Sequence, residues 1–225
     1  MLKELFSVFN QDTLMERAFQ RSYEMLDITE KMYVEAQRVL RETDANNLQF
    51  DIDDQDSEVN KYQREVRRDV FNHLAISGNA ELSSGLSLVS IVIDIERIGD
   101  FTKNIAAIAG NHQKRLTAGK FEEKLVEIEK AVADSFGRTI EVFKNSDEDA
   151  GREFLKEYKW VSGDSDGIID GLIREEDPAI SSGSAAALVL YIRSLKRISS
   201  HLRNVVTSVV NPFHRIGFKP KKKKN

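Results

Sequence analysis

Proline is almost absent from this chain, which leaves long stretches free to form helix. The three prolines stand at positions 178, 212 and 220, so the first 177 residues contain none. Proline interrupts a helix because it lacks a backbone N–H and its ring clashes with the preceding turn. Glycine is also scarce, with twelve residues in 225, while Glu, Lys, Arg, Leu and Ala are abundant. This composition favours long helices over a β-sheet.

Apolar residues recur at intervals of three and four, the spacing of one helix face, along six stretches of the chain. Thr13 with Glu16, and Ser146 with Asp149, have the spacing of capping boxes and predict the starts of the first and fifth helices. A group of three glycines predicts a break near Gly163 in the fifth helix. The predicted helices cover residues 12–45, 54–76, 82–111, 120–144, 147–175 and 183–209.

The second half of the chain repeats the pattern of the first at an offset of 100 residues. LVSIVIDIERIGDFTKNIA (88–106) aligns with LVLYIRSLKRISSHLRNVV (188–206), with five identities and the same apolar phase. Short connections make neighbouring helices antiparallel. The predicted fold is therefore all-α, a tandem pair of antiparallel three-helix bundles. The predicted parts are a first repeat (1–113), a second repeat (114–211) and a basic tail (212–225).

Composition and charge exclude several classes of protein. The chain has no cysteine, so it has no disulfide framework and no thiolate metal site. Its longest apolar run is far shorter than the roughly 20 residues of a membrane span, and we expect a soluble cytoplasmic protein. Six cations lie from residue 215 onward, which leaves residues 1–214 with a net charge of about −10. An acidic body argues against nucleic-acid binding, while Lys221–Lys224 could bring the tail close to a membrane.

Charged residues interrupt the buried pattern of the third predicted helix. Glu96, Asp100 and Asn104 are spaced by four, which aligns their oxygens on one face beside a stripe of isoleucines. Two carboxylates at the edge of a core need either a compensating cation or a proton. Hard oxygen ligands of this kind suit Mg²⁺, Ca²⁺, Mn²⁺ or iron. The alternative is a salt-bridged stripe in which Arg97, Lys103 and neighbouring helices supply the positive charge.

The stretch DIERIGDFTKNIA (94–106) resembles the signature helix of the PhoU family of phosphate-uptake regulators. The family pattern is close to D-L-E-R-I-G-D-H-A-x-N-I-A, and Phe101 replaces its usual histidine. The resemblance implies a tandem pair of three-helix bundles with metal ions on paired E/D-x-x-x-D motifs. In this chain the second motif runs from Asp56 to Asn60, so an amide replaces its last carboxylate. Asp54 or Glu58 could supply the missing carboxylate. The implied metal ligands are Glu96, Asp100, Asp56 and Asn60, and the implied ions are Fe, Zn, Mn or Mg.

The second repeat departs further from the family pattern. Asp166 and Asp170 preserve one motif, but Lys196 and Ser200 replace the family's acidic residues. A lysine ammonium in place of a ligand adds a cation where the family has an anion. We therefore predict that Lys196 forms a salt bridge with Asp166 or Asp170 in place of a metal. His201 stands at the family's histidine position.

The resemblance implies a non-enzymatic regulator of phosphate uptake and homeostasis. Its implied partners are a phosphate transporter subunit, a sensor histidine kinase, or both, and the family implies a homodimer. No nucleotide-binding loop, nucleophile elbow or zinc-protease motif occurs in the sequence. Two alternatives remain open. One is a carboxylate-rich helical metal-binding protein, and the other is an accessory protein of a sodium–phosphate cotransporter without a signalling role.

Overall fold

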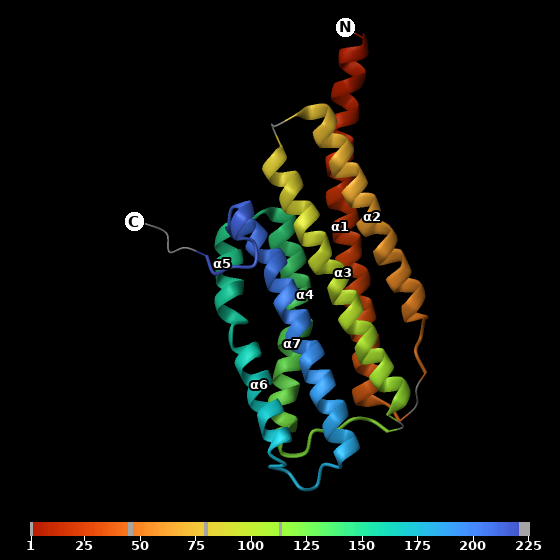
Figure 1. The fold of residues 1–225 in the computed structure, drawn as a ribbon, viewed down its shortest axis with the longest axis vertical. Helices are drawn as coiled ribbons and strands as arrows, with labels where there is room; N and C mark the ends of the chain where they lie inside the picture. Colours follow the sequence, from red (N-terminus) through yellow and green to blue (C-terminus); the bar gives the residue numbers. More distant parts are fainter. Residues whose placement is uncertain (1, 45–46, 79–80, 113, 221–225) are drawn as a thin grey trace.

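The computed structural model describes residues 2–44, 47–78, 81–112 and 114–220, and these residues form seven α-helices, two short 3₁₀ helices and no strand (Figure 1). The α-helices are α1 (Leu2–Glu42), α2 (Ile52–Ser77), α3 (Leu82–Asn111), α4 (Glu122–Asn145), α5 (Glu148–Glu157), α6 (Trp160–Ile173) and α7 (Ser182–Val210). The 3₁₀ helices are η1 (Gly119–Phe121) and η2 (Phe213–Arg215). The all-α prediction is confirmed.

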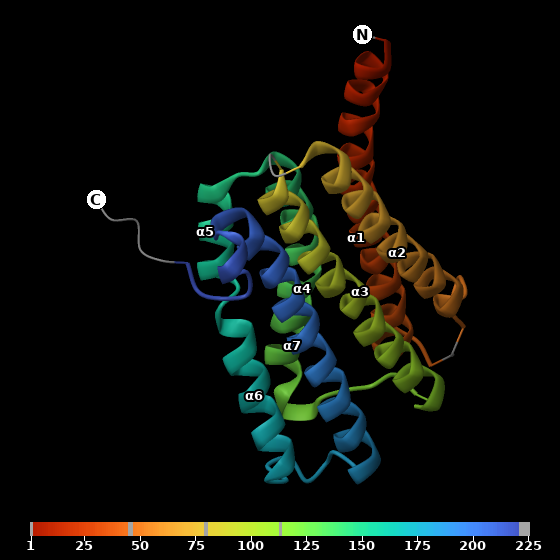
Figure 2. The ribbon, with the colours of Figure 1, turned by 45° about the horizontal axis from the view of Figure 1, so that its top comes forward.

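The helices form two bundles that lie side by side (Figures 1 and 2). α1, α2 and α3 pack together, while α4, α7 and the rod made of α5 and α6 form the second bundle. α3 and α1 of the first bundle contact α7 and α4 of the second. The N-terminal end of α1 extends beyond the other helices (Figure 1). The predicted tandem pair of three-helix bundles is therefore confirmed.

Both predicted capping boxes are wrong, although the second lies within one residue of a helix start. α1 begins at Leu2, so Thr13 lies inside the helix, because the residues before it contain neither proline nor glycine to stop it. α5 begins one residue later than predicted, and its N-cap is Asp147, whose carboxylate accepts the N–H groups of Asp149 and Ala150. Ser146 instead ends α4 in a left-handed conformation. Neither predicted capping residue is therefore the N-cap of a helix in this structure.

The predicted break in the fifth helix lies at Tyr158 and Lys159 rather than near Gly163. A methyl group added at Gly163 would meet no atom within 4 Å, so this glycine lies on an open face and keeps a helical backbone. The break instead lies between two segments that pack against different parts of the protein. Phe154 and Tyr158 pack in a small cluster against the end of α7, whereas Val161 and the rest of α6 join the main core.

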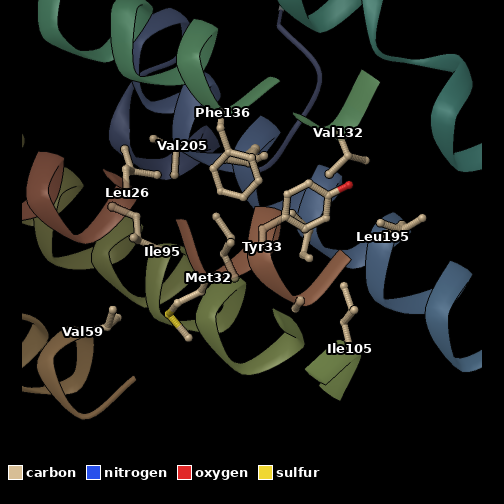
Figure 3. Packing of buried hydrophobic residues seen from close by; sticks show 14 of the residues in the cluster. Leu26, Met32, Tyr33, Val59, Ile95, Ile105, Val132, Phe136, Leu195 and Val205 are labelled. Atoms are coloured by element: carbon tan, nitrogen blue, oxygen red, sulfur yellow. The ribbon is translucent and has the colours of Figure 1, made fainter. Parts of the chain in front are cut away.

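One hydrophobic core runs through both bundles. It contains buried residues from α1, α2, α3, α4, α6 and α7 (Figure 3). At its centre the rings of Tyr33 and Phe136, from α1 and α4, stack with centroids 5.4 Å apart. Aromatic pairs of this kind add to the stability that burial alone provides. The two repeats are therefore joined by the same close packing that holds each of them together.

A buried ion pair also joins the two bundles. Arg41 of α1 donates through Nε to Oε1 of Glu129 on α4 at 2.7 Å, and both side chains are 6% exposed. Arg41 also bonds to Glu122 and to the carbonyl of Leu116. The hydroxyl of Tyr191 on α7 donates to the same oxygen of Glu129 at 2.7 Å. Side chains of α1 and α7 thus both bind one carboxylate of α4, which connects the three helices.

The C-terminal segment folds back onto the end of α7. The side-chain amide of Asn211 donates to the carbonyls of Arg215 and Phe218, at 3.0 and 2.7 Å. The N–H of Gly217, whose φ is +82°, donates to Oγ1 of Thr207 at 2.7 Å. Lys221–Lys224, the expected membrane-proximal residues, lie outside the described residues. In the described part of the chain, no helix has the length and apolar character needed to cross a bilayer.

Candidate functional site

The acidic residues predicted from the signature helix face α2. Asp56 is buried on α2 and is 5% exposed, while Glu96 and Asp100 lie one turn apart on α3, Glu96 half-buried and Asp100 exposed. Burial, and then the charges of Asp100 and Asp56, raise the pKa of Glu96. Burial and the charge of Asp56 also raise the pKa of Asp100. These three carboxylates therefore lie close enough to repel one another, and they form what we call the acidic cluster.

The fourth predicted ligand, Asn60, contacts the cluster through Asp56. Its amide nitrogen donates to Oδ2 of Asp56 at 3.0 Å. Of the two residues considered as substitutes for its missing carboxylate, Asp54 is exposed near the start of α2. The other, Glu58, lies beside Tyr62, where burial and then a hydrogen bond to Glu58 raise the pKa of the phenol.

A lysine of the signature helix already supplies positive charge to the cluster. Nζ of Lys103 lies 3.0 Å from Oδ2 of Asp56 and 3.4 Å from Oδ1 of Asp53. The charge of Arg97 contributes at longer range by opposing the rise in the pKa of Glu96. The salt-bridged arrangement considered from the sequence is therefore present at Asp56, with Lys103 as its cation.

The other oxygen of Asp56 has no partner among the described residues. Oδ1 is buried and accepts no hydrogen bond. It faces Gly99, where an added methyl group would lie 3.4 Å from Oδ1 and 3.6 Å from Cγ2 of Thr29 on α1. Gly99 therefore allows three helices to approach closely at this point. An unpartnered buried carboxylate oxygen is costly unless a cation or a donor reaches it.

The donors suit a hard cation in their chemistry, but they are not gathered into a closed site. Within the described ranges, no three His, Asp or Glu side chains converge closely enough to hold a metal ion. Carboxylate and amide oxygens are the ligands that Mg²⁺ and Mn²⁺ prefer. Asp56 Oδ1 is available to such an ion, whereas Oδ2 is already occupied by Lys103 and Asn60.

The corresponding position in the second repeat contains the predicted salt bridge. Nζ of Lys196 lies 2.6 and 2.7 Å from the two oxygens of Asp166, which confirms the pairing. Asp170 does not join it and lies 3.8 Å from Arg174 instead. The second repeat therefore has a lysine ammonium where the family pattern places an acidic ligand.

The first residue of the signature stretch has a role that the sequence did not reveal. Oδ1 of Asp94 on α3 lies 2.7 Å from Nδ1 of His201 and accepts a hydrogen bond from Asn204 at 2.9 Å, both on α7. The ring of His201 also stacks on Phe101, with centroids 5.7 Å apart. Phe101 and His201 are equivalent positions of the two repeats, so the signature helices meet at matching points. An aspartate among isoleucines was the only signal of this contact.

We expect Glu96→Gln to raise the melting temperature at pH 7 by roughly 1–2 °C, a small effect because the side chain is only half-buried. The folded-state pKa of Glu96 is raised, so the folded protein holds more protons than the unfolded chain between the two pKa values. Stability then rises as the pH falls through this range. The gain from Glu96→Gln should accordingly be present at pH 7 and vanish near pH 4.

Thermal melts of the wild type and Glu96→Gln between pH 4 and 8 would measure this difference. Glu141→Gln, at an exposed position on α4, is the matched control and should show no such pH dependence. A Glu96→Gln protein that is less stable than the wild type at pH 7 would show that the carboxylate is needed for a favourable contact.

Comparison with known proteins supports the resemblance seen in the signature stretch. Residues 23–109 match the family model of the PhoU domain. PhoU from Pseudomonas aeruginosa has the same fold, with a TM-score of 0.80 and 22% identity over 88% of this chain and 96% of that one. The phosphate transport system regulatory protein PhoU from Streptococcus pneumoniae also has this fold, with a TM-score of 0.78 and 16% identity over 89% of this chain and 95% of that one. No curated protein sequence matches significantly.

Proposed function

We propose, on the premise that residues 23–109 form a PhoU domain within a PhoU fold, that this protein is a non-catalytic regulator of phosphate uptake. It acts in the cytoplasm as a helical adaptor that binds a phosphate transporter subunit, a sensor histidine kinase, or both. The match of the PhoU domain, which includes the whole signature stretch 94–106, is the observation that carries this proposal.

The end of the first bundle offers a surface suited to such a partner. Four large apolar side chains are exposed where α2 ends and α3 begins, namely Phe71 (71%), Ile76 (54%), Leu82 (41%) and Leu86 (37%). Exposed apolar groups gathered at one end of a protein are typical of interaction sites. An amphipathic segment of a transporter or kinase could bind there through helix packing.

Affinity capture of the full chain from its own cells, grown with ample phosphate, tests the proposal. We expect a transporter subunit or a sensor kinase to be recovered, and Phe71→Glu to reduce its recovery without affecting the fold. Lys130→Glu, at an exposed position on α4, is the control. Deletion of the gene should alter phosphate uptake or the response to phosphate starvation. An unchanged uptake and an unchanged response would contradict the proposal.

The same proposal includes a homodimer, which the family resemblance implies. The chain has a mass of 25.6 kDa. Light scattering on the purified full chain at micromolar concentration should therefore give twice this mass. A monomer at all concentrations tested would contradict this part of the proposal and leave the regulatory role to be judged by the capture experiment.

We also propose that the acidic cluster binds a divalent metal ion through Asp56, Glu96 and Asp100, with Asn60 at its edge. The unpartnered Oδ1 of Asp56 supports this, because no donor or cation of the described residues reaches it. The raised pKa values of Glu96 and Asp100 also support it, because burial and the neighbouring carboxylates disfavour their charged forms. A bound ion would neutralise this charge and connect α2 to α3. The candidate ions are Fe, Zn, Mn or Mg, and no reaction is assigned to them.

Because Lys103 competes for Asp56, its removal should strengthen metal binding. We expect Lys103→Met to bind Mn²⁺ about tenfold more tightly than the wild type, and Asp56→Asn to lose binding. Isothermal titration with metal-free protein measures both. Lys196→Met, which removes the lysine that pairs with Asp166 in the second repeat, is the control and should leave Mn²⁺ binding to the acidic cluster unchanged. Equal Mn²⁺ uptake by the wild type and Asp56→Asn would contradict this site.

A further inference from the structure

A cavity of about 710 Å³ lies between α5, the C-terminal half of α7 and the segment that folds back after α7. Its volume is in the range of small-molecule sites, about 300–1,000 Å³. Five cationic side chains line it, and none of its described lining residues is acidic. The cations are Arg152, Lys156, Lys159, Arg203 and Lys219. We call this site the basic cavity, and it is notable in a chain whose overall charge is −4.

Arg203 is the cation of the basic cavity whose charge is partly buried without a carboxylate partner among the described residues. Its side chain is half-buried on α7, and no carboxylate of the described residues lies within salt-bridge distance of it. Burial lowers the pKa of its guanidinium, and no nearby carboxylate opposes this shift. Arg152 differs, since its Nη2 lies 3.7 Å from Glu148. Buried charges in proteins are normally paired, so the cavity presents a cation that the protein itself does not neutralise.

The wall of the basic cavity is held in place by specific contacts. Asn211 binds the carbonyls of Arg215 and Phe218, and Gly217 donates to Thr207. The positive φ of Gly217 turns the chain so that Lys219 is placed at the cavity. A side chain at position 217 would be strained in this conformation. The backbone of this wall is therefore fixed, and the five cations line one space, Arg152 and Arg203 partly buried and the three lysines exposed.

We propose that the basic cavity binds a small anion that carries two or more phosphate groups. Guanidinium groups match phosphate oxygens in geometry, and lysine ammonium groups add further charge. Even without Arg152, which pairs with Glu148, the four remaining cations exceed the charge of roughly −2 of a single phosphate group. The cavity is also larger than one phosphate requires. The proposal stands independently of the regulatory role, because it rests on the charges and shape of this cavity alone.

Two sources could supply this chemistry, an inorganic oligophosphate or a nucleoside with a phosphate chain. Phe218 lines the cavity and is 64% exposed, so its ring is available to stack on a base. Tripolyphosphate and ATP distinguish the two sources. If Phe218→Ala weakens the binding of ATP only, the ligand is a nucleotide. If it weakens the binding of neither compound, the protein recognises the phosphate chain alone. Both results support the proposal.

Isothermal titration and thermal melts of the full chain, without divalent metal, test the inference. We expect tripolyphosphate to bind and to raise the melting temperature, and Arg203→Gln to weaken binding about tenfold or more, as expected for losing hydrogen bonds to a charged group. Arg193→Gln, an exposed arginine of α7 outside the basic cavity, is the matched control and should bind normally. Lys156→Gln, at an exposed position, tests the same site with no risk to the fold.

A ligand-free measurement adds a second readout. Without anion, Arg203→Gln should be at least as stable as the wild type, because it removes a half-buried charge that no carboxylate compensates. The inference is overturned if Arg203→Gln and Lys156→Gln bind tripolyphosphate as tightly as the wild type. It is also overturned if citrate, a carboxylate of similar charge, binds as tightly as tripolyphosphate, or if neither phosphate compound binds.

Discussion

Replacing Arg41 with methionine is expected to lower the free energy of unfolding by about 3–5 kcal/mol at pH 7. The substitution leaves Glu129 buried without its guanidinium partner, and only the hydroxyl of Tyr191 remains bonded to that carboxylate. The net stability of a domain is only about 5–15 kcal/mol, so this loss is a large share of it. Urea denaturation of the purified variant measures the change.

The pH dependence of this variant identifies the cause. Burial already raises the pKa of Glu129 in the wild type, where Arg41 opposes the rise, and the loss of Arg41 should raise it further. The folded variant then holds more protons than the unfolded chain, so its stability should recover as the pH falls towards the raised pKa. A second substitution, Glu129→Leu, should restore most of the lost stability at pH 7. A single variant that loses under 1 kcal/mol would contradict the buried-charge explanation.

Phe136→Ala is expected to cost a similar amount, about 3–5 kcal/mol. Phe136 is fully buried on α4, and its ring stacks on Tyr33 of the other bundle, so the substitution leaves a cavity between the two repeats (Figure 3). Chemical denaturation followed by circular dichroism measures the loss. Phe71→Ala, which removes a ring that is 71% exposed, is the matched control and should stay within about 0.5 kcal/mol of the wild type.

The two bundles should also unfold together. Arg41 and Phe136 both lie where α1 meets α4, and the core is continuous across this contact. We therefore expect one cooperative transition in the wild type. Two separate transitions in the wild type would contradict this shared core, and the effects of both substitutions would then be confined to one repeat.

The local properties of the sequence predicted most of the helices. α3 was predicted at residues 82–111, its observed bounds, because an apolar face, a lack of proline and polar ends are all properties of neighbouring residues. Lys196 was predicted to pair with Asp166 or Asp170, and the structure places it on Asp166. The break at Tyr158 was misplaced, since glycine permits a bend but packing against α7 and the main core decides where it occurs.

By itself, the sequence determined the helices and the acidic stripe of the signature helix, because these depend on the spacing of residues close together in the chain. It also determined the duplication, because the pattern of residues 88–106 recurs at 188–206.

For the contacts between the two bundles, only the tertiary structure decided which charges meet. Glu129 pairs with Arg41, which is 88 positions away in the sequence, and Asp94 bonds to His201, which is 107 positions away. Arg203 has no carboxylate partner among the described residues. Such pairings follow from how the helices pack, and the whole core determines that packing. The spacing of neighbouring residues therefore does not predict them.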